Sequence, residues 1–162
     1  LSQKNGATLL NTGRAHIAHA MVKKGYVASV DEAFKKYLSK GMSCYVPRKT
    51  YSPKESIEMI KNAGGLAILA HPVYITEDYG KLYSLLKQLK EYGLDGTECL
   101  YNCYSEEFSK MCFDICDKLG LVKSGGSDFH GGNKPDVELG KVAGGYVPYE
   151  FLLNMKEQRG LM

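Results

Sequence analysis

The sequence predicts an α/β fold built around a parallel sheet. Amphipathic segments with helical spacing alternate with short apolar runs from residue 52 onward, which is the pattern of repeated βα units. Glycines follow the segments that are expected to be helices, where a left-handed residue commonly ends a helix. A chain of 162 residues, 44% of them hydrophobic, is long enough to bury one core.

The first 51 residues predict two helices and a linker. The first helix is expected from about Thr12 to Lys24. Ser29–Glu32 forms a capping box that begins a second helix, and this helix is expected to end at Gly41. Residues 42–51 are expected to be extended because Pro47 excludes helix. The two helices together predict a small αα-hairpin ahead of the βα units.

Residues 52–162 predict three βα-type units and a tail. Ser52 and Glu55 form a second capping box, and Ile57 and Ile60 are expected to face the core. Leucines at helical spacing predict one buried face for the next helix. In chain order the expected elements are helix 53–63, strand 65–70, helix 78–92, strand 96–101, helix 106–119, strand 120–124, strand 141–146 and a helix from residue 148.

A carboxylate and an imidazole stand two residues apart after the third expected strand. Asp128 and His130 lie in the stretch 124–132, which carries a pair of glycines on each side of them. Residues i and i+2 of an extended segment share a face, so these side chains can reach one metal ion or two neighbouring ions. The alternative is that Asp128 caps a turn and that His130 is an ordinary surface histidine.

A second histidine stands at another strand end. His71 follows the apolar run 65–70, and Pro72 prevents the strand from continuing. Barrels and open α/β sheets build their active sites from residues at the carboxyl ends of their strands. A structural histidine has no reason to recur at such a position, so the pattern favours a metal site that includes His71.

Several stretches resemble a known family and occur in the family's order. They are Gly13–Ala18, Tyr45–Arg48, Ala70–Pro72, Gly93–Glu98 and Gly126–Gly131. The family is that of the polymerase and histidinol phosphatase (PHP) metal-dependent phosphoesterases, and the subgroup is that of nucleoside 3′,5′-bisphosphate phosphatases and 5′-3′ exoribonucleases. The family's first motif, a His-x-His followed by a Ser-Asp, and its second, a Glu and a His, have no counterpart here. The chain therefore resembles the C-terminal part of such an enzyme.

The resemblance implies the second half of a distorted (β/α)₇ barrel with a small helical insertion. Residues 1–51 would form the insertion, which acts as a lid, together with its linker, and residues 52–162 would form the C-terminal βα units. Half a barrel leaves open strand edges that need cover. The missing N-terminal half of the domain or a second copy of the chain is therefore an expected partner.

The resemblance also implies the metal site. His71, Asp128 and His130 would be ligands, whereas the family's metal-binding Glu belongs to the missing second motif. Glu98 would consequently lie behind the ligands rather than among them. The chain departs from the family at Tyr104, where a histidine is common, and this difference puts one substrate contact in doubt.

Phosphate binding is implied for the first helix. Arg14 and His16 match the family's Arg-x-His, and an arginine can grip a phosphate by two parallel hydrogen bonds. His19 has no such match and is expected at the surface. Arg48 is a further candidate for phosphate binding, and a solvated arginine explains it nearly as well.

The implied activity is metal-assisted hydrolysis of a phosphate ester in a phosphorylated small molecule or a short oligonucleotide. Divalent ions, Mn²⁺ first and Zn²⁺, Fe²⁺ or Mg²⁺ as alternatives, would activate the water. The chain alone is expected to be inactive because the first two motifs are absent. A non-catalytic structural or binding PHP module, and a plain α/β binding domain without metal, are the alternatives.

Composition limits the class of protein. A net charge of +3 is too small for a protein that coats nucleic acid, although a mildly basic surface suits anionic substrates. Because no apolar run approaches about 18 residues, no membrane span is expected. The N-terminus lacks the design of a signal peptide, and the expected location is the cytoplasm.

The cysteines offer a zinc alternative. Cys99, Cys103, Cys112 and Cys116 form a C-x₃-C-x₈-C-x₃-C run. Cys112 and Cys116 lie on the apolar stripe of an expected helix, where a free thiol behaves as a small core residue. Structural zinc sites usually space their cysteine pairs more tightly, so the core interpretation is favoured.

Overall fold

The computed structural model describes residues 13–47 and 50–161. It divides into two compact units, residues 1–50 and residues 51–162. Within the described residues, none of the helices has the length and apolar character needed to cross a membrane. The two units are taken separately below.

The first unit is built from two short helices. Helix α1 spans Arg14–Lys23, as the sequence predicted, and α2 spans Val30–Ala33. The Ser29 hydroxyl accepts the backbone N–H of Glu32 at 3.1 Å, which confirms the predicted cap. A small core holds the unit together, made of Ala18, Val27, Ala33 and Leu38.

The second predicted helix changes its winding after one turn. Residues Phe34–Leu38 form a π-helical turn that follows α2 directly. The Arg14 guanidinium contacts this turn: it donates to the Leu38 carbonyl at 3.2 Å and lies 5.9 Å from the Phe34 ring centroid. A wider turn leaves the last carbonyls open to such a partner.

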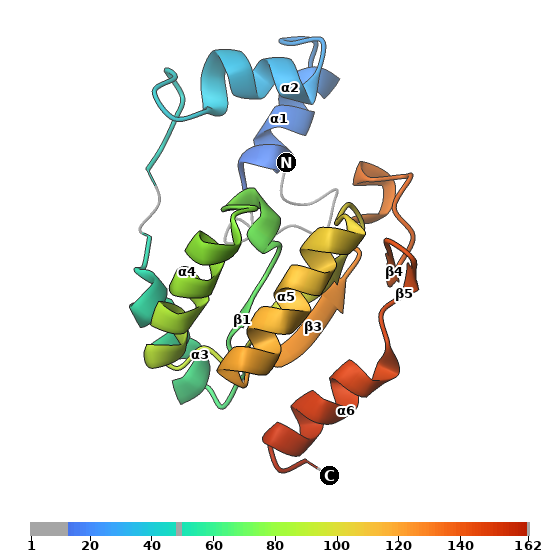
Figure 1. The fold of residues 1–162 in the computed structure, drawn as a ribbon. Helices are drawn as coiled ribbons and strands as arrows, with labels where there is room; N and C mark the ends of the chain where they lie inside the picture. The colour runs from blue at the N-terminus through green and yellow to red at the C-terminus, as the bar shows by residue number, and fades with distance from the viewer. Residues whose placement is uncertain (1–12, 48–49, 162) are drawn as a thin grey trace. The chain divides into compact units, whose positions relative to one another are not determined.

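The second unit carries a three-stranded parallel sheet in the order β1-β2-β3. The strands are β1 (Ile68–Leu69), β2 (Gly96–Tyr101) and β3 (Val122–Gly126). Helices α3 (Pro53–Asn62), α4 (Tyr79–Glu91), α5 (Glu106–Leu119) and α6 (Tyr149–Gln158) surround it. Figure 1 shows α4 and α5 side by side in front of the strands. The predicted α/β class with a parallel sheet is confirmed.

Local capping chemistry begins three helices of this unit, α3, α4 and α5, where the sequence predicted. Ser52 accepts the N–H of Glu55 at 3.2 Å, Asp78 that of Lys81 at 2.8 Å and Ser105 that of Phe108 at 3.1 Å. Each cap satisfies a backbone donor that the first turn of a helix leaves free.

The core lies between the sheet and the helices α3, α4 and α5. Its fully buried residues include Leu82, Leu86, Cys99, Cys112, Ile115 and Cys116. Strands β2 and β3 approach each other closely at Gly96, where an added Cβ would lie 2.3 Å from the Val122 carbonyl oxygen. Only glycine fits this contact, so Gly96 sets the close packing of the central strand.

The strand expected over residues 65–70 is much shorter in the structure. Only Ile68 and Leu69 pair with β2, because side chains take the backbone groups on both sides. The Asp95 carboxylate accepts the Ala67 N–H at 2.7 Å, and Glu98 accepts the His71 N–H at 2.6 Å.

Two further expectations were wrong. Residues 141–146 form an antiparallel hairpin of β4 (Lys141–Val142) and β5 (Gly145–Tyr146) rather than one strand, because Gly144 at φ 85° lets the chain reverse. Ile60 is 41% exposed because its side chain lies over Gly65 at the edge of α3, whereas Ile57 is buried as expected.

Candidate metal centre

The carboxyl ends of the parallel strands bring the candidate ligands to one edge of the sheet. His71 follows β1 by two residues, and Asp128 follows β3 by two residues. Strand β2 lies between these two strands and ends at Tyr101. Parallel topology therefore gathers the two loops at the same edge, as expected for a site in an open α/β sheet.

His71 and Asp128 share an unusual backbone. His71 has φ 33° and Asp128 has φ 54°, and within residues 13–47 and 50–161 they are the only non-glycine residues with positive φ. Such a conformation costs an L-residue about 1–2 kcal/mol, less for Asp. Strain of this kind gathers at functional sites, because the surrounding structure must enforce it. The backbone thus singles out two of the three predicted ligands.

Glu98 binds the backbone of the loop that carries His71. Its Oε2 accepts the backbone N–H of His71 at 2.6 Å, and the residue is only 8% exposed. Burial raises the pKa of this carboxyl, and the charge of Asp128 adds to the effect, while the bond from His71 opposes it. Gly126 makes room for the carboxylate, because an added Cβ would lie 2.8 Å from Glu98 Oε1.

A β-bulge brings Tyr101 to the same site as Glu98. Glu98 pairs with Ser124 and Leu100 with Gly125, so Cys99 is an extra residue in β2. An extra residue reverses the alternation of side chains, and two residues three apart then reach the same face. Cys99 meanwhile contacts Cys116 of α5, with 3.4 Å between the sulfur atoms.

Tyr101 connects the two loops. Its hydroxyl donates to Asp128 Oδ2 at 2.9 Å, and its ring centroid lies 5.8 Å from that of His71. Burial and the bond to Asp128 raise the pKa of the hydroxyl, so it remains a donor. Neither Tyr101 nor Lys134, which also bonds Asp128, was predicted from the sequence.

Asp128 is held by a second donor and lies beside His130. The ammonium group of Lys134 forms an ion pair with Asp128 Oδ2, and this bond, followed by that from Tyr101, lowers the pKa of the carboxyl. His130 Nδ1 lies 2.7 Å from the Asp128 backbone oxygen and 3.4 Å from Oδ1. Because a carbonyl oxygen only accepts, Nδ1 carries a hydrogen in this contact, which leaves Nε2 as the nitrogen that can bind a metal.

The donor types fit a divalent transition metal, since imidazole and carboxylate groups suit Mn²⁺ and Zn²⁺. Across the part of the chain that the structure describes, however, no three His, Cys, Asp or Glu side chains converge on one point. The arrangement is instead two pairs, Asp128 with His130 and Glu98 with the His71 backbone, joined by Tyr101. Among the described residues, these two pairs are what the strand ends bring together.

The predicted phosphate residues lie in the other unit. Arg14 bonds the Leu38 carbonyl and lies 5.5 Å from the Tyr45 ring centroid. His16 Nδ1 accepts the Gly13 N–H at 3.1 Å and so caps its own helix. His19 is exposed, as expected, and Arg48 lies outside the described residues.

The zinc alternative finds no support in the described residues. Cys99, Cys112 and Cys116 are buried as free thiols, Cys103 is exposed, and no metal-binding group of three is present there. Tyr104 is also a core residue, 4% exposed, with its ring 4.7 Å from that of Phe108. At this position the chain has a packed aromatic side chain in place of a candidate substrate contact.

Comparisons with known proteins support the family resemblance. No family model matches the chain. The chain is 34% identical over 129 residues to a 5′-3′ exoribonuclease of Haemophilus influenzae, covering 78% of the chain and 47% of the relative. It is 30% identical over 128 residues to a 3′,5′-nucleoside bisphosphate phosphatase of Chromobacterium violaceum, covering 78% and 45%.

Two solved structures share the fold. A protein assigned as a metal-dependent phosphoesterase, from Bifidobacterium adolescentis, has a TM-score of 0.70 at 26% identity, covering 96% of this chain and 52% of that one. An amidohydrolase from Chromobacterium violaceum, with bound sulfate and no metal, has a TM-score of 0.60 at 28% identity, covering 84% and 45%.

The chain thus combines an α/β fold with sequence similarity to proteins named as phosphoesterases and exoribonucleases. The resemblance to the PHP family is confirmed, and the chain is a homologue of its exoribonuclease and bisphosphate phosphatase members. The chain spans about half the length of these relatives.

Proposed function

We propose that the chain is the C-terminal part of a metal-dependent phosphoesterase that hydrolyses phosphate esters of nucleotides or short oligonucleotides. One observation carries this proposal. His71 and Asp128 are both held in a strained backbone at the carboxyl ends of parallel strands, and Tyr101 contacts both of them. The names of the relatives, which act on nucleoside bisphosphates or RNA, support the class of substrate.

In this proposal His71, Asp128 and His130 hold divalent metal, with Mn²⁺ as the first candidate. A metal ion held there would activate a water and neutralise charge on the phosphoryl oxygens. Asp128 presents its carboxylate under the control of Tyr101 and Lys134. Glu98 fixes the backbone from which His71 projects.

In this proposal, residues of the first unit and its linker bind the phosphate of the substrate. Arg14 uses one of its five donors on the Leu38 carbonyl, so the others can grip an anion. His16 presents an exposed ring at the start of α1, and Arg48 is the third candidate. Residues 1–51 act as a lid with its linker in this proposal, and residues 52–162 as the C-terminal units of a (β/α)₇ barrel.

The remaining ligands come, in this proposal, from an N-terminal half of the domain or from a second copy. The 162-residue chain alone should therefore hydrolyse mononucleotides and dinucleotides no faster than background. Adding the N-terminal half should restore Mn²⁺-dependent hydrolysis, and Asp128→Ala should abolish it, while Asp114→Ala on the exposed side of α5 should not. Robust metal-dependent turnover by the chain alone would contradict the need for outside ligands.

A non-catalytic structural or binding module is the second candidate. The observation in its favour is that no three ligands converge within the described residues. Metal analysis of the longer protein separates the two candidates, because a binding module has no need to retain Mn²⁺ after dialysis. Stoichiometric metal that is lost in Asp128→Ala would favour the enzyme.

A further inference from the structure

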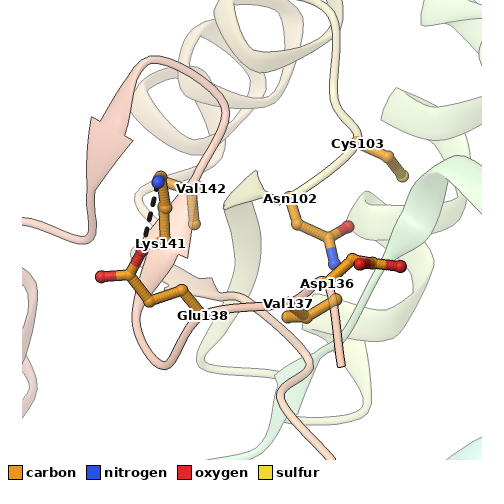
Figure 2. A pocket seen from close by; sticks show the side chains of 7 residues that line it. All are labelled: Asn102, Cys103, Asp136, Val137, Glu138, Lys141 and Val142. Carbon is orange, nitrogen blue, oxygen red and sulfur yellow. Dashed lines mark hydrogen bonds and ion pairs between the residues drawn. The ribbon is translucent and has the colours of Figure 1, made fainter. Parts of the chain in front are cut away.

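A pocket lies beside the candidate metal centre, and none of the residues that line it has been assigned a role above. It has a volume of about 330 Å³, within the range of small-molecule sites. Asn102 and Cys103 from the loop after β2 line it, together with residues 136–138 and strand β4. Figure 2 shows Asn102, Cys103 and Asp136 on one side of the pocket and the Glu138–Lys141 pair on the other.

The pocket shares its wall with the candidate site. Asn102 directly follows Tyr101, and its Nδ2 donates to the backbone oxygen of Ser127, the residue before Asp128, at 2.7 Å. The sulfur of Cys103 lies 3.9 Å from the hydroxyl of Tyr74, whose ring is 5.6 Å from that of His71. A ligand whose phosphate lies at the metal centre can therefore place its next group in this pocket.

Two side chains that line this pocket each have an acceptor that bonds none of the described residues. Because the Ser127 carbonyl only accepts, the amide of Asn102 must present Nδ2 to it, which leaves Oδ1 as the free atom. The Asp136 carboxylate has no hydrogen bond or ion pair with any residue in the described part of the chain. Glu138 differs, since Lys141 lies 3.1 Å from it and the Tyr146 hydroxyl also donates to it.

Two valines add apolar surface to the pocket. Val137 and Val142 contribute side chains, and Val142 is only 6% exposed. The combination of apolar walls with two acceptors suits a flat ring that carries hydrogen-bond donors on its edge. Among nucleobases this is the amine-bearing edge of cytosine, adenine or guanine, to which carboxylates and amide oxygens bond. Uracil presents a carbonyl in place of the amine and would set acceptor against acceptor.

We propose that this pocket binds the nucleobase of the substrate and selects bases with an exocyclic amine. This inference rests on the proposed function, because it takes the substrate to be a nucleotide. Asp136 accepts from the amine, and Asn102 Oδ1 accepts a second donor or orients the ring. The bond that fixes Asn102 on Ser127 also couples base binding to the loop of Asp128.

The test uses cytidine and uridine, which differ at the amine and carry no phosphate. Titration of the isotope-labelled chain by NMR should shift the backbone amides of Asn102 and Val137, and cytidine should bind about tenfold more tightly than uridine. In Asp136→Asn the side chain offers a donor as well as an acceptor, so the two nucleosides should bind within about twofold of each other. Glu138→Gln, a neighbour whose carboxylate is already paired, should keep the preference.

Three results would overturn the proposal. The first is equal affinity for cytidine and uridine, and the second is the absence of any amide shift at Asn102 and Val137 up to the solubility limit of either nucleoside. The third is a preference for cytidine that persists in Asp136→Asn. Equal shifts with putrescine would also overturn it, because they would show a site for any amine. This test measures binding and not hydrolysis. If the longer protein had no phosphoesterase activity, the proposed function would be refuted, but the preference for cytidine could still be observed.

Discussion

The loops after β1 and β3 carry the same kind of strained residue but are supported in different ways. At His71 the support acts on the backbone, whose N–H is bonded to the buried Glu98. No hydrogen bond from a described residue reaches the imidazole nitrogens of His71, and its aromatic neighbours among these residues are Tyr74 and Tyr101. At Asp128 the support acts on the side chain, through Tyr101 and Lys134.

This difference in support affects how each residue can bind a cation. The imidazole of His71 is placed by its backbone and keeps both nitrogens available to a ligand. The carboxylate of Asp128 is already partly neutralised by an ammonium group, which a metal must displace or accommodate. Changes to Glu98 and its surroundings should therefore act on the first loop, and changes to Tyr101 on the second.

Gly126→Ala should have the largest effect and should break the backbone support. The new Cβ would meet Glu98 Oε1 at 2.8 Å, so the carboxylate must move away from the His71 N–H. We expect a loss of about 2 kcal/mol in the free energy of unfolding, measured with urea. Gly132→Ala is the control, since nothing lies within 4 Å of its added Cβ. Equal losses in the two variants would refute the role of Glu98.

The strain at His71 should be visible in a matched pair of variants. His71→Gly and His71→Ala both remove the ring, but only glycine adopts φ 33° freely. The glycine variant should be more stable than the alanine variant by about 1 kcal/mol, measured by thermal unfolding. Ala70→Gly is the control. Because Ala70 lacks a positive φ, replacing this alanine by glycine should lower the stability relative to the wild type. A less stable His71→Gly would mean that the left-handed backbone is not enforced.

Tyr101→Phe should have the smallest effect on stability and the sharpest effect on one loop. The ring stays in the core, while the hydroxyl that bonds Asp128 is lost. NMR should show the amide of Asp128 shifted and that of His71 almost unchanged. Tyr79→Phe, which removes a hydroxyl that bonds Asp114 and Lys118 of α5, is the control. Comparable shifts at both loops would remove the distinction between them.

Much of the fold could be predicted because its signals are local. Ser52, Asp78 and Ser105 cap helices through residues three positions away, and glycines such as Gly120 end them in a left-handed conformation. The hairpin at 141–146 was missed although Gly144 and Gly145 mark a turn between two short strands. Its strands are only two residues long and show no alternation by which to recognise them.

The candidate site could be predicted only as a set of residue types at strand ends. His71, Asp128 and His130 stand out by their position, but the partners that hold them come from distant parts of the sequence. Tyr101 was missed because regular alternation places it on the opposite face from Glu98, and the bulge at Cys99 depends on tertiary packing. Lys134 lies in the same loop as Asp128, and a basic residue there was a usable signal.

The distribution of thiols has a practical consequence for the relation between the two units. Cys99, Cys112 and Cys116 are buried, whereas Cys44 in the unit of residues 1–50 and Cys103 in the unit of residues 51–162 are exposed. Maleimide dyes added to the native protein should therefore attach at these two positions and leave the other three unmodified. The natural sequence thus carries one donor and one acceptor position for energy transfer. Single-molecule spectra could then follow the separation of the units in solution, with and without nucleotide, without any cysteine being introduced.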